Sequence, residues 1–115
     1  MSIKADRARL EFILRMITSI ETIVQRHGDI DAALTDIEGQ NALLMFLLQI
    51  GEKISRIEGE QYRVLLPVKE ASSVRNFIAH DYDGINLQII KDIVLTDIPV
   101  LKKNLNEILK SENPA

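Results

Sequence analysis

Residues 42–50 read ALLMFLLQI, the longest apolar run in the chain. Nine residues form only about 13 Å of α-helix, far less than the thickness of a bilayer. Because the run is apolar on nearly every side, it predicts the central, most buried helix of the fold, extending over about 38–57. Gly51 within this pattern costs roughly 1 kcal/mol relative to Ala, which predicts that another helix packs closely at this position.

The segment before this helix shows the apolar periodicity of a long helix over residues 3–26. Its main apolar stripe consists of Leu10, Ile13, Leu14, Ile17, Ile20 and Val24. A second apolar row consists of Phe12, Met16 and Ile23. Two rows predict two packing partners, the bundle itself and a second copy of the chain. Gly28 is expected to end this helix.

The remaining segments complete a helical pattern. We expect a short helical turn at 29–37, a connector at 58–67, a third helix from Pro67 to near His80, and a last helical stretch at 86–110. Thr96, Asp97 and Pro99 predict a break with a new N-cap in that last stretch. No strand pattern competes. The sequence therefore predicts an all-α, antiparallel bundle of four to five helices, one domain over 1–115 with 110–115 as a frayed tail.

Composition and charge exclude several classes of protein. The chain has no cysteine, which excludes a disulfide scaffold, a thiolate zinc site and a cysteine nucleophile. Its net charge of −3 argues against a broad basic face that binds duplex DNA, although a nuclease that holds one or two phosphates stays compatible with it. The charged N-terminus does not resemble a signal peptide, so we expect a cytoplasmic protein without membrane contact.

The stretch VRNFIAHDYDG at 74–84 concentrates residue types suited to phosphodiester chemistry. It places Arg75, Asn76, His80 and Tyr82 within eight positions, in a chain with two histidines and two tyrosines. Histidine transfers protons near neutral pH, and a guanidinium offers a flat fork of donors to a phosphate. On a helix Asn76 lies one turn below His80, where its side chain can orient the imidazole.

The spacing of Arg75 and His80 constrains how the two side chains can meet. Five residues correspond to about 140° around a helix, so one regular helix does not direct both to a single point. Either the helix unwinds at His80, or two copies face each other so that the Arg of one approaches the His of the other. The second apolar row of the first helix favours the composite cleft between two copies.

Simpler interpretations stand beside this one. The motif is also compatible with a helix C-terminus that carries an exposed histidine. Asp81 and Asp83 with His80 form a conceivable cation site, but DYDG is explained more simply as a turn, and we expect no metal. We interpret His27 as a solvated helix-end residue, and Tyr62 as a packing residue whose hydroxyl faces solvent.

The spacing Arg75-Asn76, three further residues, His80, one residue, Tyr82 resembles the R-x4-H-x-Y signature of HEPN-domain toxins of the HepT type. The stretches IGEKISRI at 50–57 and LTDIPVLKKNLNEIL at 95–109 are similar to other parts of that family, so the resemblance covers most of the chain. It implies a HEPN-like homodimer that cuts RNA without a metal or cofactor. In that family the Arg and His are the nuclease residues, which correspond to Arg75 and His80, and the polar residue after the Arg, here Asn76, supports them.

The resemblance also implies a partner, an MNT-type nucleotidyltransferase antitoxin that adenylylates the motif tyrosine, here Tyr82. The added phosphate and nucleoside would compete for Arg75 and repel RNA. A second hypothesis is a non-catalytic helical dimer that binds and regulates such a nucleotidyltransferase. The acidic charge balance favours this alternative, whereas the residue types of the motif favour the nuclease.

Overall fold

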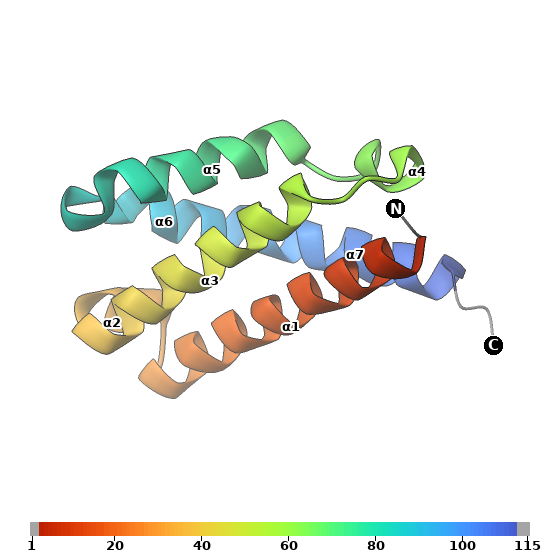
Figure 1. The fold of residues 1–115 in the computed structure, drawn as a ribbon. Coiled ribbons are helices and arrows are strands. Elements are labelled where there is room, and N and C mark those ends of the chain that lie inside the picture. The colour runs from red at the N-terminus through yellow and green to blue at the C-terminus, as the bar shows by residue number, and fades with distance from the viewer. Residues whose placement is uncertain (1–2, 113–115) are drawn as a thin grey trace.

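The computed structural model describes residues 3–112. Within that range every element of regular secondary structure is a helix, as the sequence predicts. Figure 1 shows the arrangement along the chain. The α-helices are α1 (Ile3–His27), α2 (Ile30–Thr35), α3 (Ile37–Ser55), α4 (Glu60–Arg63), α5 (Val68–Asp81), α6 (Leu87–Asp92) and α7 (Ile98–Glu112). A 3₁₀ turn, η1 (Tyr82–Gly84), follows α5, and a π-helical segment, η2 (Ile93–Asp97), joins α6 to α7.

Helix α3 is the centre of the bundle, as predicted from its apolar run. It packs between α1 and α5, which run antiparallel to it, while α6, η2 and α7 lie behind this layer (Figure 1). The described residues form a flat molecule of 40 × 30 × 19 Å. Leu43, Leu44 and Leu47 are almost fully buried, whereas Met45 remains 45% exposed on the opposite side of the helix.

Helix α1 follows its main apolar stripe. Leu10, Ile13, Ile17 and Ile20 are at most 1% exposed and form one wall of the core. The helix ends at His27, directly before Gly28, whose φ of 104° lies in the left-handed region that glycine adopts without strain. Both the stripe and the predicted stop are therefore confirmed.

The connector between α3 and α5 contains the short helix α4 and is attached to the start of α1 by one carboxylate. Asp6 is fully buried, and its two oxygens accept hydrogen bonds from the backbone N–H groups of Glu58 (3.0 Å) and Gly59 (2.7 Å). Burial raises the pKa of Asp6, but these bonds and the Arg9 guanidinium at 3.0 Å outweigh it, so the net pKa is lowered. Tyr62 is only 1% exposed, so the expectation of a solvent-facing hydroxyl is wrong.

The last helical stretch changes geometry where a break is predicted, but not by a new N-cap. The backbone stays helical from α6 through η2 into α7, and the Ile98 N–H bonds to the Ile93 carbonyl, the wider i−5 pattern of a π-helix. Pro99 offers no N–H and its ring crowds the carbonyl four residues earlier, which the wider turn accommodates. Helix α7 runs to Glu112, whereas a frayed tail is expected from residue 110; residues 113–115 lie outside the described residues.

A bilayer-spanning helix is not found: within residues 3–112 none of the helices combines the necessary length and apolar character.

Candidate functional site

Helix α5 carries the first part of the motif. Arg75, Asn76 and His80 all lie on it, and Tyr82 follows in η1. The helix continues to Asp81, so it does not unwind at His80. Within one chain the side chains at 75 and 80 therefore leave the axis about 140° apart. An unwound helix end, the first of the two arrangements expected to bring them together, is therefore not found in this helix.

The Arg75 guanidinium lies against α3. Its Nη1 donates to the Glu52 carboxylate (3.2 Å) and to the Ser55 hydroxyl oxygen (3.2 Å), and 28% of the side chain is exposed. Its Nη2 donates to Asn76 Oδ1 at 3.4 Å. The guanidinium is thus held in one orientation by three neighbours while part of it stays open to solvent.

The residues that hold Arg75 form a small network of their own. Ser55 donates its hydroxyl proton to the Glu52 carbonyl oxygen (2.7 Å), which leaves its oxygen lone pairs for Arg75. Glu52 also approaches Arg56, at 3.6 Å. Glu52 and Ser55 were not identified from the sequence as site residues. The available signal was their three-residue spacing on one helix, which places both on a single side.

His80 is exposed on the last turn of α5. Among residues 3–112 no hydrogen bond or ion pair involves its imidazole. The expected support from Asn76 takes a different form, because the Asn76 amide oxygen accepts from Arg75 instead. In this arrangement the imidazole is free to face a ligand or a second copy of the chain.

Tyr82 connects the end of the motif to the beginning of α3. Its ring packs against the core, and its hydroxyl donates to Asn41 Oδ1 at 3.2 Å. Asn41, Met45, Leu48 and Glu52 follow each other on α3 at intervals of four, three and four residues, so they share one outward row. This row therefore contains both Asn41, which bonds to Tyr82, and Glu52, which bonds to Arg75.

His27 is the last residue of α1, as expected, but it is not simply solvated, because its side chain is only 23% exposed and has defined partners. Its Nδ1 lies 2.8 Å from the Ile23 carbonyl oxygen and its Nε2 lies 3.2 Å from Asp36 Oδ2. The bonds to Ile23 and Asp36 raise the pKa of His27, since only the protonated ring donates to both acceptors. Asp36 caps α3 by accepting from the Gly39 N–H (2.9 Å), so His27 joins the end of α1 to the start of α3.

A metal site is not apparent around Asp81 and Asp83. Within the described part of the chain, no three histidine, cysteine, aspartate or glutamate side chains gather as a metal ion would require.

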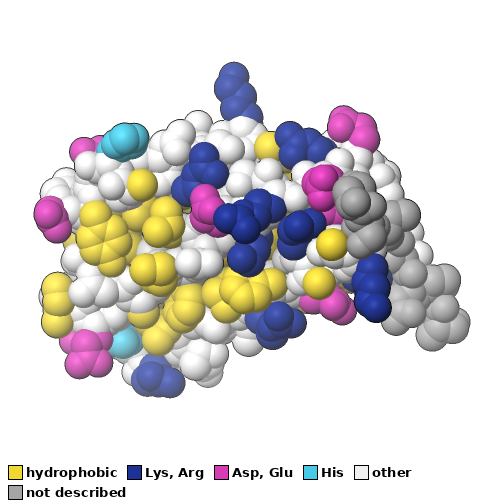
Figure 2. Space-filling model, viewed as in Figure 1, with side chains coloured by type: hydrophobic (Ala, Val, Ile, Leu, Met, Phe, Trp, Pro, Cys, Tyr) yellow, Lys and Arg dark blue, Asp and Glu magenta, His cyan; other side chains and the backbone are white. Residues whose placement is uncertain are grey.

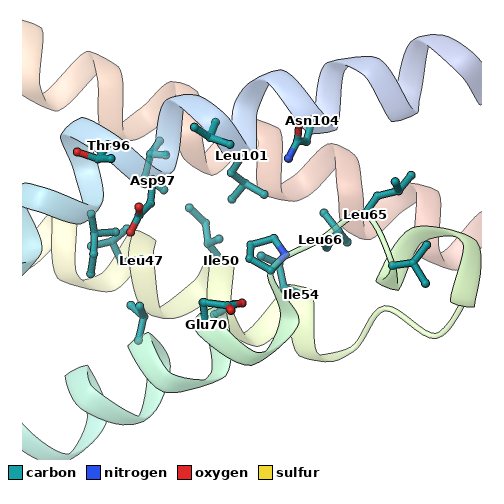
Figure 3. Close-up of a pocket in the computed structure, with 18 residues that line it drawn as sticks. Leu47, Ile50, Ile54, Leu65, Leu66, Glu70, Thr96, Asp97, Leu101 and Asn104 are labelled. Carbon is teal, nitrogen blue, oxygen red and sulfur yellow. The ribbon is translucent and has the colours of Figure 1, made fainter.

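An apolar cavity of about 400 Å³ lies between α5 and the η2–α7 segment, with α3 as its floor (Figure 3). Ile50 and Ile54 line this floor, and the carboxylates of Glu70 and Asp97 lie at its sides. No histidine, arginine or lysine lines it. The cavity therefore has no cation to hold a phosphate, and Arg75, Asn76, His80 and Tyr82 do not line it.

The fold is an all-α bundle of the HEPN-like class. A family profile described as "Ribonuclease HepT-like" matches residues 13–108, and the chain belongs to this family. "Putative RNase TTE0752" of Caldanaerobacter subterraneus subsp. tengcongensis is 31% identical over 113 residues, covering 95% of this chain and 98% of the relative. "Putative RNase MJ0127" of Methanocaldococcus jannaschii is 29% identical over 103 residues, covering 86% and 85%. No solved structure matches the chain significantly.

Proposed function

We propose that this protein is a metal-independent endoribonuclease toxin whose catalytic residues are Arg75 and His80, with Asn76 in support. One observation carries the proposal. The Arg75 guanidinium is oriented by hydrogen bonds to α3 and stays partly exposed to solvent, and the exposed imidazole of His80 lies on the same helix. Membership of a ribonuclease family supports the same reaction class.

The reaction uses the RNA's own 2′-hydroxyl. Its oxygen attacks the adjacent phosphorus, the bond from phosphorus to the 5′-oxygen breaks, and the products are a 2′,3′-cyclic phosphate and a 5′-hydroxyl. His80 takes the proton from the 2′-hydroxyl or gives one to the departing 5′-oxygen, and an imidazole near neutral pH serves in either role. Arg75 binds the phosphate oxygens, where negative charge builds up in the transition state.

The complete site is a cleft between two copies of the chain. One copy supplies Arg75 and the other supplies His80, because the two residues diverge by about 140° on one helix. Figure 2 shows hydrophobic side chains gathered on the face formed by α1, α3 and α5. Met45, at 45% exposure, and the half-buried Leu48 belong to the outward row of α3 that joins the partners of Tyr82 and Arg75. An apolar surface beside the motif supports self-association there.

Regulation acts through Tyr82. A partner nucleotidyltransferase of the MNT type transfers AMP from ATP to the tyrosine hydroxyl, releasing pyrophosphate. The hydroxyl donates to Asn41 at 3.2 Å, and this hydrogen bond is lost on modification because the adenylylated oxygen carries no proton. The new phosphate, two residues from His80, then competes for Arg75 and repels the RNA backbone.

The test is RNA cleavage by purified protein in the presence of EDTA. We expect cleavage by the unsubstituted protein and products that end in a 2′,3′-cyclic phosphate. His80→Ala and Arg75→Ala are expected to lower the rate by at least about 100-fold. Cleavage by His80→Ala at the unsubstituted rate would refute the proposal. Intact mass before the assay shows whether the preparation carries AMP, and any adduct should disappear in Tyr82→Phe.

A second candidate is a non-catalytic helical dimer that binds and regulates the nucleotidyltransferase. It is favoured by the net charge of −3 and by the Glu52 carboxylate, which already neutralises Arg75. This candidate predicts no growth defect when the chain is expressed alone. A growth arrest that requires His80 would exclude it.

A further inference from the structure

Two cations share one aromatic ring on the surface of the α1–α3 layer. Lys53 Nζ lies 4.8 Å from the centroid of the Phe12 ring, and Arg15 Cζ lies 5.6 Å from the same centroid. Both distances are within the range of a cation–π interaction, which holds each charge in place. The Phe12 ring therefore has two positively charged groups beside it on the surface.

Neither of these cations is neutralised by an acid. Among residues 3–112 neither Arg15 nor Lys53 forms an ion pair. In contrast, Arg7 on the same helix pairs with Glu11, at 3.8 Å. Two cations without an acidic partner therefore lie near one ring, and an anion that approaches either of them is stabilised.

The pair continues towards the motif through α3. Lys53 precedes Arg56 by three residues, and Glu52 bridges Arg56 (3.6 Å) to Arg75 (3.2 Å). Figure 2 shows lysine and arginine side chains gathered over the middle of this face, beside the hydrophobic area. We call Arg15, Lys53 and Arg56 the basic strip. With Arg75 it brings together four cations and a single bridging carboxylate in a chain whose net charge is −3.

We infer that the basic strip binds the phosphate backbone of single-stranded RNA and leads the strand to Arg75. This inference rests on the proposed function, since it names the path of that substrate. Ordered cations along a surface are how proteins follow a single strand without reading its bases. The strip also explains how an acidic protein holds RNA: its positive charge is local.

The test measures binding without cleavage, in a His80→Ala protein, with a fluorescein-labelled single-stranded RNA of about 20 nucleotides. Arg15→Ala/Lys53→Ala should weaken binding roughly tenfold at low salt and reduce the slope of log K against log salt by up to about 1.4, because about 0.7 is lost per phosphate contact on a single strand. The matched control, Lys103→Ala/Lys110→Ala, removes two exposed charges from α7 and should change affinity less than about twofold.

A second variant separates charge from folding. Arg15→Lys/Lys53→Arg keeps both charges and should bind within about twofold of the parent. Loss of binding in this variant, unchanged binding in Arg15→Ala/Lys53→Ala, or no RNA binding by the parent would each overturn the inference. Tighter binding of poly-L-glutamate than of RNA under the same conditions would also overturn it, and would assign the strip to an acidic protein partner.

The two proposals fail separately. If the unsubstituted protein does not cut RNA but RNA binding depends on Arg15 and Lys53, the nuclease assignment is wrong and RNA binding by the basic strip is supported. If His80-dependent cleavage is found but RNA affinity does not depend on Arg15 and Lys53, RNA binding by the basic strip is wrong and the nuclease assignment is supported.

Discussion

Gly51 of α3 lies directly against Arg75 of α5. A β-carbon at position 51 would lie 2.9 Å from the Arg75 Cβ and 2.9 Å from the Ala71 carbonyl oxygen, closer than real contacts allow. The close packing predicted from Gly51 is therefore confirmed, and it occurs at the proposed catalytic arginine. The absence of a side chain here lets α5 approach near enough for Arg75 to bond to Glu52 and Ser55.

We expect Gly51→Ala to displace α5 and misplace Arg75. Overpacking against backbone costs about 1–3 kcal/mol, which outweighs the helix-propensity gain of about 1 kcal/mol. The free energy of unfolding should fall by about 1 kcal/mol, and RNA cleavage by at least about tenfold, because small misplacements are costly in catalysis. Denaturant unfolding and cleavage rates measure both effects. Gly84→Ala is the stability control, since a β-carbon there meets nothing within 4 Å.

Ser55→Ala tests whether the orientation of Arg75 matters for the reaction. The variant removes a hydrogen bond to a charged donor, worth about 1.5–3 kcal/mol. We expect kcat to fall about tenfold or more with a smaller effect on KM, because positioning acts mainly in the transition state. Ser73→Ala is the matched control, since its hydroxyl bonds only to the Lys69 carbonyl on the same helix. Equal kcat in both variants would show that Glu52 alone suffices.

The helices follow from local information, which is why the sequence predicts them well. Apolar periodicity identifies α1 and α3, and Gly28 marks the end of α1. The change at residues 93–97 is also visible locally, through Pro99. Its form is not, because a π-helical segment and a new N-cap both accommodate proline, and only the packing of α6 and α7 on the core selects between them.

The motif itself is visible in the sequence because it occupies consecutive turns of one helix. The groups that hold it are not, because they come from α3: Glu52 lies 23 residues before Arg75, and Asn41 lies 41 before Tyr82. The same limit explains Asp6, whose backbone donors are 52 and 53 residues away. Pairings at such separations depend on the tertiary fold and leave no local pattern.

Asp6→Asn should destabilise the protein by about 3 kcal/mol. The carboxylate accepts two backbone N–H groups and an arginine, whereas an amide presents its own N–H₂ to one of these buried donors. The lowered pKa gives the sign of the pH effect: the stabilisation is present above the usual value of 3.8 and is lost as pH falls through the folded value. Urea unfolding near neutral pH and in acid measures this. Asp97→Asn, at an exposed position, should differ little from the unsubstituted protein.

The His27–Asp36 contact makes stability depend on pH near neutrality. The raised pKa of His27 means that its contribution is complete below the usual value of 6.5 and is lost as pH rises through the folded value. The lowered pKa of Asp36 means that its contribution is present above 3.8 and is lost as pH falls through the folded value. The contact therefore contributes most to stability at pH values between the folded-state pKa of Asp36 and the folded-state pKa of His27.

We expect His27→Gln to be less stable than the unsubstituted protein in weak acid and to approach it in alkali. A neutral imidazole donates to only one of its two acceptors, Ile23 O and Asp36 Oδ2, so above the folded pKa the native side chain loses the advantage that the charged ring has over an amide. Free energies of unfolding from urea titrations at about pH 5.5 and about pH 9 measure the difference. If the difference in free energy of unfolding between the two proteins is the same at both pH values, the ring acts by packing against Gly39 and not by its proton.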